Sequence, residues 1–229
     1  MNYSIRKSSD RGFYDHGWLK TIHTFSFGGY YDPEFMGFGT LRVINEDRVA
    51  PNKGFGAHDH QNMEIITYVL EGQLAHRDST GTESILGANE LQLMHAGSGI
   101  THSEYNPSSK DAVHFLQIWI KPDIQDAKPG YQQMLPVLMK NQLTLVASKD
   151  GQQGSLQMHQ NAKLYIADMD LGSSFTIQIG QFGWLQVASG SFLFGDVVID
   201  HGDGIAIESP GELTLTAKTA GKVLFFELH

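Results

Sequence analysis

The sequence predicts an all-β protein made of two antiparallel β-barrels of the jelly-roll type. Short apolar or alternating runs recur at intervals of roughly 8–12 residues and are separated by Gly, Asn, Asp and Pro, a pattern typical of sandwiches and barrels. The chain has 229 residues, of which 25 are glycine, and this favours many tight turns over long helices. The second half of the chain also follows the plan of the first half.

Five of the expected strands lie in the first half, which we take as an N-terminal barrel over residues 1–121. Their ranges are 39–49, 63–72, 73–78, 90–97 and 113–120. The segment 122–136 contains three of the seven prolines and is predicted to be a linker.

A second series of strands predicts a C-terminal barrel over residues 137–229. The runs are 143–148, 162–169, 174–180, 184–190, 191–195, 204–208, 212–217 and 222–229. The stretch YVLEGQLAH matches LQVASGSFLF when Gly72 is set against Gly190. With that offset His58 and His60 fall on Thr176 and Gln178, so the second barrel is expected to bind no metal and to close over its own core.

The composition excludes several classes of function. The net charge is -9 and the pI is about 5.6, with no basic run, so we expect no binding to nucleic acid or to an anionic membrane. The absence of cysteine excludes disulfides, thiolate nucleophiles and zinc–cysteine sites. The start lacks the apolar core of a secretory signal, and no apolar run approaches the ~20 residues that span a bilayer. These features predict a soluble cytoplasmic protein.

Two histidines lie one residue apart in GFGAHDHQNMEIITYVLEG, the stretch from position 54 to position 72. Side chains at i and i+2 of a strand share a face, so His58 and His60 would point together into a barrel. Two inward imidazoles are unfavourable unless their nitrogens have partners. A metal ion would be such a partner.

A second pair follows in AGSGITHSEYNP (96–107), where His102 and Glu104 share a face if the segment is extended. Two such strands would present three imidazoles and one carboxylate to one interior, a set that suits Fe(II), Mn, Co, Ni, Cu or Zn. Four protein ligands at a five- or six-coordinate centre leave a position open for Lewis-acid work or oxygen activation. A closed four-coordinate zinc that only holds the fold is the structural alternative.

Several other histidines have an ordinary interpretation. A single histidine on an apolar face is usually a core residue with a satisfied hydrogen bond. We interpret four in this way: His76, His95, His114 and His201.

The two motifs resemble those of the cupin superfamily. The first cupin motif has a glycine, His-x-His, a later glutamate and a final glycine, matched here by Gly54, His58, His60, Glu64 and Gly72. The second motif ends in Gly-x-x-His-x-x-x-Asn, matched by Gly99, His102 and Asn106, although Gly97 stands where proline is usual.

More specifically, the chain resembles the pirin family of the bacterial quercetin 2,3-dioxygenase-like type. The stretch HGWLKTIHTFSFGGYYDPEFMGFGTLRVINED (16–47) is similar to its N-terminal signature, and both histidine motifs fit its metal motifs. The resemblance implies a bicupin fold with one metal, usually iron, in the N-terminal barrel. The implied ligands are His58, His60, His102 and Glu104.

The carboxylate ligand has two candidates, because other cupins use the first-motif glutamate, which is Glu64 here. We favour Glu104, because its spacing from His102 satisfies the two-residue period of a strand. Glu64 could then orient a ligand imidazole.

The resemblance implies a dioxygenase that cleaves flavonols such as quercetin with dioxygen and releases carbon monoxide. A carboxylate at the metal could take the hydroxyl proton, and Glu104 is the candidate, although ligation reduces its basicity. An aromatic pocket near the motifs could be lined by Phe25, Phe27, Met36 and Phe55, or these residues could simply be core. Pirin-like proteins also include regulators, in which the redox state of iron changes a surface that binds a protein partner. Both readings use the same four ligands, and a pocket leading to an open metal position would favour the enzyme.

Overall fold

The chain forms two units of β-sheet in the computed structural model, which describes residues 2–229. The first unit comprises residues 12–136 and 158–160, and the second comprises residues 2–11, 137–157 and 161–229. Within the described residues the only helical segments are two 3-10 turns, η1 (Ser8–Asp10) and η2 (Gln152–Gly154). The all-β prediction is therefore confirmed, and no helix of the described residues is long and apolar enough to cross a membrane.

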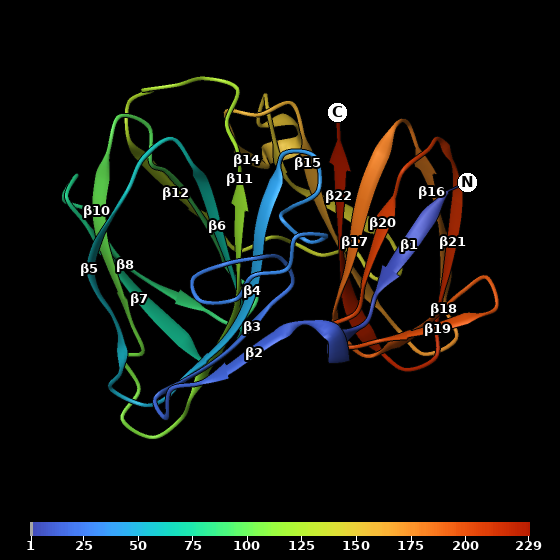
Figure 1. The fold of residues 1–229 in the computed structure, drawn as a ribbon, viewed down its shortest axis with the longest axis horizontal. Helices are drawn as coiled ribbons and strands as arrows, with labels where there is room; N and C mark the ends of the chain where they lie inside the picture. The colour runs from blue at the N-terminus through green and yellow to red at the C-terminus, as the bar shows by residue number, and fades with distance from the viewer. Residues whose placement is uncertain (1) are drawn as a thin grey trace. The chain divides into compact units, whose positions relative to one another are not determined.

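Two sheets make up the first unit, and they face each other in Figure 1, with β5 and β10 opposite β6 and β11. The seven-stranded sheet has the order β12-β9-β6-β11-β4-β3-β2, spanning Gly130–Met134, Leu91–His95, Glu64–Glu71, Val113–Ile120, Leu41–Val49, Leu19–His23 and Gly12–Asp15. The four-stranded sheet has the order β5-β10-β7-β8, spanning Gly54–His60, Ile100–Tyr105, Gln73–Asp78 and Glu83–Gly87.

The second unit has the same pair of sheet sizes. Its seven-stranded sheet has the order β1-β20-β17-β22-β15-β13-β14, spanning Tyr3–Arg6, Gly204–Ile207, Phe182–Ser189, Gly221–Leu228, Lys163–Met169, Leu143–Ser148 and Leu156–Gln157. Its four-stranded sheet has the order β16-β21-β18-β19, spanning Ser174–Ile179, Gly211–Ala217, Ser191–Phe194 and Val197–Asp200.

The match between Gly72 and Gly190 is confirmed by their places in the two sheets. Gly72 joins β6 to β7 with φ 80°, and Gly190 joins β17 to β18 with φ 84°. A Cβ atom would approach the carbonyl oxygen of Ala112 at the first position and of Ala220 at the second. Both turns therefore require glycine for the same two reasons, a positive φ and a close backbone neighbour.

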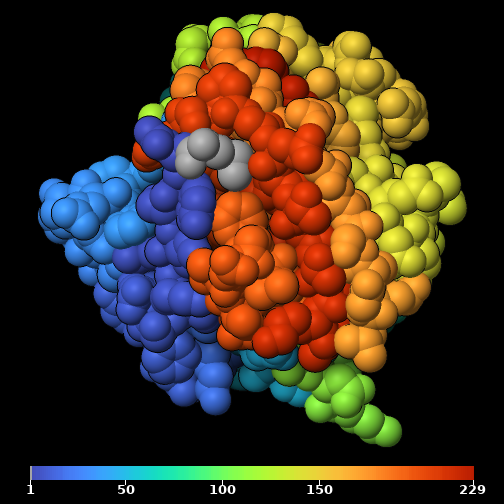
Figure 2. Space-filling model, turned by 90° about the vertical axis from the view of Figure 1, so that its right-hand side faces the viewer, coloured from blue at the N-terminus to red at the C-terminus, as the bar shows by residue number. Residues whose placement is uncertain are grey.

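The observed grouping of residues differs from the expected boundaries at three places, one of which is residues 158–160, which group with the first unit rather than with the expected C-terminal barrel. Residues 2–11 belong to the second unit, because β1 pairs with β20 from Tyr3↔Ile207 to Arg6↔Gly204. Figure 2 shows these first residues, in blue, running along the orange and red surface of that unit. The expected linker 122–136 contains β12, which pairs with β9 and extends the seven-stranded sheet of the first unit.

The interior of the first unit is apolar at both ends and polar in the middle. On β6, Ile65 and Val69 belong to two separate apolar clusters, and Thr67 lies between them on the same face. On β11, Gln117 lies in the same way between Phe115 and Trp119. The interior of the second unit is instead one large apolar cluster.

Gly54 permits the close pairing of β5 with β10, and its replacement by alanine is expected to destabilise the fold. A Cβ atom at Gly54 would overlap the carbonyl oxygen of Glu104 and the backbone of Tyr105. We expect Gly54→Ala to lower the free energy of unfolding by about 1–3 kcal/mol in urea titrations. Gly56→Ala on the same strand is the control, because its nearest neighbour would be a hydroxyl oxygen 3.9 Å away. Equal stability of the two variants would contradict this packing.

Candidate functional site

The two histidine motifs form neighbouring strands whose register brings their side chains together. β10 pairs with β5 in antiparallel fashion, with His102 opposite His58 and Ile100 opposite His60. A bulge between His102 and Glu104 then shifts the register, so that Glu104 lies opposite Phe55. His58, His60, His102 and Glu104 therefore all lie on β5 and β10, which confirms that both motif segments are strands.

His58, His60 and His102 form a cluster in which each offers a ring nitrogen within 4.8 Å of the others. The Nε2 atoms of His58 and His102 are 3.0 Å apart. The Nδ1–H of His58 donates to the carbonyl oxygen of Gly56 at 2.8 Å, so its Nε2 carries the lone pair. Three imidazoles with converging nitrogens are side chains that could hold a cation that accepts nitrogen ligands.

Burial keeps two of these imidazoles neutral. Desolvation, followed by repulsion from His102 and His58, lowers the pKa of His60 to about 4. Desolvation, followed by repulsion from His58 and His76, lowers the pKa of His102 to about 3. Neutral imidazole is the form that binds metal ions, so the site needs little proton release before binding at neutral pH.

Glu104 is 1% exposed and is held by three polar side chains from the opposite sheet. Its Oε1 accepts hydrogen bonds from Gln92 Nε2 at 2.9 Å and Thr67 Oγ1 at 3.4 Å, and its Oε2 accepts one from Gln117 Nε2 at 2.9 Å. Within the described residues no lysine or arginine pairs with Glu104. The carboxylate is therefore buried and hydrogen-bonded but has no cationic side chain to balance its charge.

A pocket of about 400 Å³ opens onto His58, His60 and Glu104. Its other walls are largely apolar and include Phe27, Phe55, Leu19 and Trp119. The Trp119 ring lies between His60 and Phe27, with ring centroids 4.9 Å from the first and 5.2 Å from the second. This volume lies within the roughly 300–1,000 Å³ of small-molecule sites.

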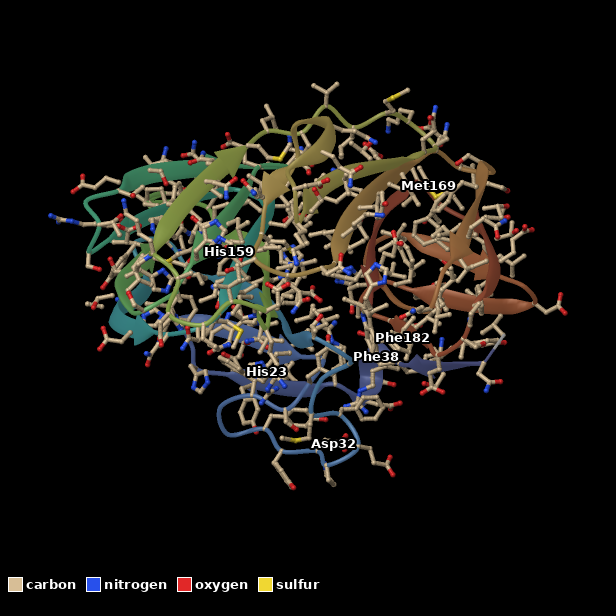
Figure 3. All side chains as sticks on the ribbon, turned by 90° about the horizontal axis from the view of Figure 1, so that it is seen from above. His23, Asp32, Phe38, His159, Met169 and Phe182 are labelled. Carbon is tan, nitrogen blue, oxygen red and sulfur yellow. The ribbon has the colours of Figure 1, made fainter. Side chains whose placement is uncertain are left out.

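The polar part of the pocket wall includes His23, which Figure 3 labels. Its Nδ1 is hydrogen-bonded to Asn45 Oδ1 at 2.7 Å. The pocket thus combines flat aromatic walls with a few fixed polar groups, which suits a planar ligand with hydroxyl substituents. Of the four aromatic or apolar residues suggested from the sequence, Phe27 and Phe55 line it, whereas Phe25 is buried core and Met36 is exposed beside another hollow.

Glu64 lies outside this cluster, in a group of its own. Its Oε2 accepts hydrogen bonds from His95 Nδ1 at 2.7 Å and from the backbone N–H of His159 at 2.9 Å. On β6, Glu64 alternates with Ile65, which belongs to the interior cluster, so the glutamate projects from the opposite face of the sheet. The idea that Glu64 orients a ligand imidazole is therefore wrong, because its partners are His95 and His159.

His76 is a buried histidine with a hydrogen-bond partner, Asp78, as the sequence suggested, but it also lies beside the candidate site. It lies on β7 opposite Glu104, and a ring nitrogen of His76 is within 4.8 Å of ligand atoms of His102 and Glu104. The other three histidines interpreted as core also have hydrogen-bond partners: His95 with Glu64, His114 with Glu46, and His201 with the carbonyl of Ala188. The polar partners of Glu104 were not predicted from the sequence, although Gln117 is a polar residue in the otherwise apolar run HFLQIWI.

The corresponding positions of the second unit are apolar, and the expected match needs a correction. The offset of 118 places His58 and His60 on Thr176 and Gln178, but these side chains are exposed and pair with Thr214 and Glu212. The inward residues of β16 are Ile177 and Ile179, which belong to the apolar cluster. The loop between β16 and β17 differs in length from the loop between β5 and β6, so the true match is shifted by one residue. A shift of one residue exchanges the two faces of a strand.

Comparison with known proteins matches most of each unit to a protein-family model. The family model described as Pirin matches residues 4–120, and the model described as Quercetinase C-terminal cupin domain matches residues 145–228. The chain is 43% identical over 226 residues to a quercetin 2,3-dioxygenase of Escherichia coli K12, covering 98% of this chain and 97% of that protein. The chain belongs to the pirin family. Its two units are the two cupin domains of a bicupin.

Two further comparisons extend over nearly the whole chain. A putative quercetin 2,3-dioxygenase of Pasteurella multocida is 39% identical, with 92% of each chain covered. The crystal structure of the bacterial pirin YhhW from Escherichia coli in complex with nickel(II) superposes with a TM-score of 0.95, at 42% identity and with 99% of each chain covered. The fold of this pirin-family chain is therefore the fold of a protein known to accommodate nickel(II).

The lowered pKa values predict how the metal-free protein responds to acid. We expect His60 and His102 to stay neutral until the pH approaches about 4 and about 3. In the unfolded chain they would protonate near the ordinary value of about 6.5, so the free energy of unfolding falls as the pH drops from there toward 4. Titration of the imidazole ¹⁵N shifts by NMR measures both values. Titration of both rings near pH 6.5 would contradict their burial.

Proposed function

We propose that this pirin is a metal-dependent dioxygenase that cleaves flavonols such as quercetin. The observation that carries the proposal is the largely apolar pocket of about 400 Å³ that opens onto His58, His60 and Glu104. The names of the relatives from Escherichia coli and Pasteurella multocida support it. In this proposal the metal ligands are His58, His60, His102 and Glu104.

The residues present fit a single divalent ion. Two of the three imidazoles are held neutral by burial, and the buried carboxylate of Glu104 has no cationic partner within the described residues. A divalent ion would balance that charge and would occupy the lone pairs that converge between the rings. Three nitrogens and one oxygen suit Fe(II), the ion that the family resemblance favours, and also Ni(II), the ion bound by the relative YhhW.

The pocket walls would bind and orient the flavonol. The Trp119 and Phe27 rings offer apolar surface to a flat aromatic ring system, and Phe55 closes another side. When bound, the ion would act as a Lewis acid that lowers the pKa of the flavonol 3-hydroxyl and provides an open position for oxygen chemistry. Exclusion of water by the aromatic walls would protect the resulting anion from protonation.

Glu104 would accept the hydroxyl proton, the step that prepares the substrate for reaction with dioxygen. Gln92 and Thr67 hold Oε1, and Gln117 holds Oε2, which keeps a further lone pair. In the overall reaction both atoms of dioxygen would enter the ring-opened product, and one ring carbon would leave as carbon monoxide.

The alternative function is redox-sensing regulation through a protein partner. The same four residues would hold the ion, but a regulator needs no cavity beside it. The aromatic pocket that reaches His58 and His60 therefore favours catalysis. Absence of direct nucleic acid binding and a cytoplasmic location stay predictions from the sequence.

Carbon monoxide release from quercetin tests the reaction. We expect release under air from protein reconstituted with Fe(II) or Ni(II), and a loss of at least 100-fold in His58→Ala, because one ligand of the ion is removed. His201→Ala is a matched control in the second unit, since its Nδ1 also donates to a backbone carbonyl at 2.8 Å. No release from metal-loaded wild-type protein would contradict the flavonol reaction.

Replacement of Glu104 by glutamine tests its role in proton transfer. Glutamine keeps one acceptor oxygen and nearly the same shape, but it cannot take the hydroxyl proton. We expect kcat for quercetin to fall by about 10²–10⁴-fold at saturating metal, measured together with metal content. A kcat within threefold of the wild-type value in fully loaded Glu104→Gln would show that another group accepts the proton.

A further inference from the structure

Two buried histidine nitrogens near the site have no hydrogen-bond partner within residues 2–229: the Nδ1 atoms of His76 and His102. Both side chains are inaccessible, with His76 2% and His102 1% exposed. Their ring centroids are 5.4 Å apart, and the rings are tilted by 51°. The two rings are neighbours, and buried polar atoms are rarely left without a partner.

His76 is fixed by a carboxylate on its far side. Its Nε2 lies 3.1 Å from Asp78 Oδ2, and both side chains are fully buried. Asp78 in turn accepts hydrogen bonds at Oδ1 from the Thr80 N–H at 2.8 Å, the Thr80 hydroxyl at 2.6 Å and the Thr82 N–H at 3.2 Å. A carboxylate with these donors is an acceptor only, so His76 carries its proton on Nε2 and exposes the lone pair of Nδ1.

His102 has the complementary requirement. Its Nε2 points toward His58 Nε2, 3.0 Å away, and is the atom that would bind the metal. With Nε2 bound, the ring proton is on Nδ1 and needs an acceptor, because metal-bound imidazoles almost always donate their other N–H. On the neighbouring ring, His76 Nδ1 is a candidate acceptor with a free lone pair.

We propose that His76, anchored by Asp78, is the hydrogen-bond acceptor for the Nδ1–H of His102 and so orients that imidazole toward the metal. The inference rests on the proposed metal site and adds to it a positioning pair that approaches from β7. The chain Asp78–His76–His102 would fix both the rotation and the tautomer of His102, while His58 is fixed by the carbonyl of Gly56.

A second buried histidine–carboxylate pair offers a matched control. His114 Nε2 lies 3.0 Å from Glu46 Oε1, with both side chains about as buried as those of His76 and Asp78. Neither ring nitrogen of His114 is left unsatisfied. Replacing His114 therefore removes a comparable pair from the same unit without touching His102.

The first test measures Ni(II) affinity by competition with a chelator, in the full chain. We expect His76→Ala to weaken binding by about 10–100-fold and Asp78→Asn to weaken it in the same direction, because an amide can donate to His76 and reverse its tautomer. His114→Ala should bind Ni(II) within about threefold of wild type, and circular dichroism confirms folding of each variant. Equal affinity of His76→Ala and His114→Ala would overturn the inference.

The second test observes the hydrogen bond itself, in Zn(II)-loaded protein with ¹⁵N-labelled histidine. We expect a slowly exchanging His102 Nδ1–H resonance with a scalar coupling across the hydrogen bond to His76 Nδ1. A His102 Nδ1–H that exchanges rapidly or couples to another acceptor would overturn the inference even if metal binds tightly. Failure of the wild-type chain to bind Ni(II) or Zn(II) at all would instead contradict the proposed metal site, and the inference with it.

Discussion

The register between β5 and β10 is the constraint on which the site depends. Because His102 lies opposite His58, the Nε2 atoms of the two rings approach to 3.0 Å. The bulge after His102 then moves Glu104 to a place where three polar side chains of the opposite sheet reach its carboxylate. A slip of one residue in either strand would turn its ligands to the outer face.

The two units use one framework for different purposes. At the inward positions of β16 and β21 the second unit has Ile177, Ile179, Leu213 and Leu215, which pack into a continuous apolar core. The first unit has histidines and a glutamate on the corresponding strands β5 and β10, and it satisfies much of their polarity with hydrogen bonds from Thr67, Gln92 and Gln117. An apolar interior stabilises a barrel more simply, so the polar layer is best explained by function rather than by stability.

Much of this arrangement could be predicted from the sequence, because it depends on local patterns. The two-residue period places His58 with His60 and His102 with Glu104 once their segments are strands, and Gly72 with Gly190 identifies the repeated turn. Long-range pairings are different. The pairing of β1 with β20 and the addition of β12 to β9 depend on which edges are left free after the barrels form, and no local pattern encodes this.

The polar environment of the candidate ligands also could not be predicted from the sequence. Gln92, Gln117 and His76 each lie in a strand with no recognisable motif, and their role depends on which opposite face they meet. The same holds for Glu64, which sequence comparison with other cupins offers as a ligand and which the sheet turns away from the site. Motif spacing therefore identifies candidate ligands, and the direction of each side chain decides among them.

Anomalous X-ray diffraction at the nickel absorption edge, from crystals of the Ni(II)-loaded chain, tests the central claim most directly. The account predicts one strong peak per chain, within bonding distance of His58, His60, His102 and Glu104. A peak at Glu64, His95 and His159 instead, or no ordered nickel in the first unit, would contradict it.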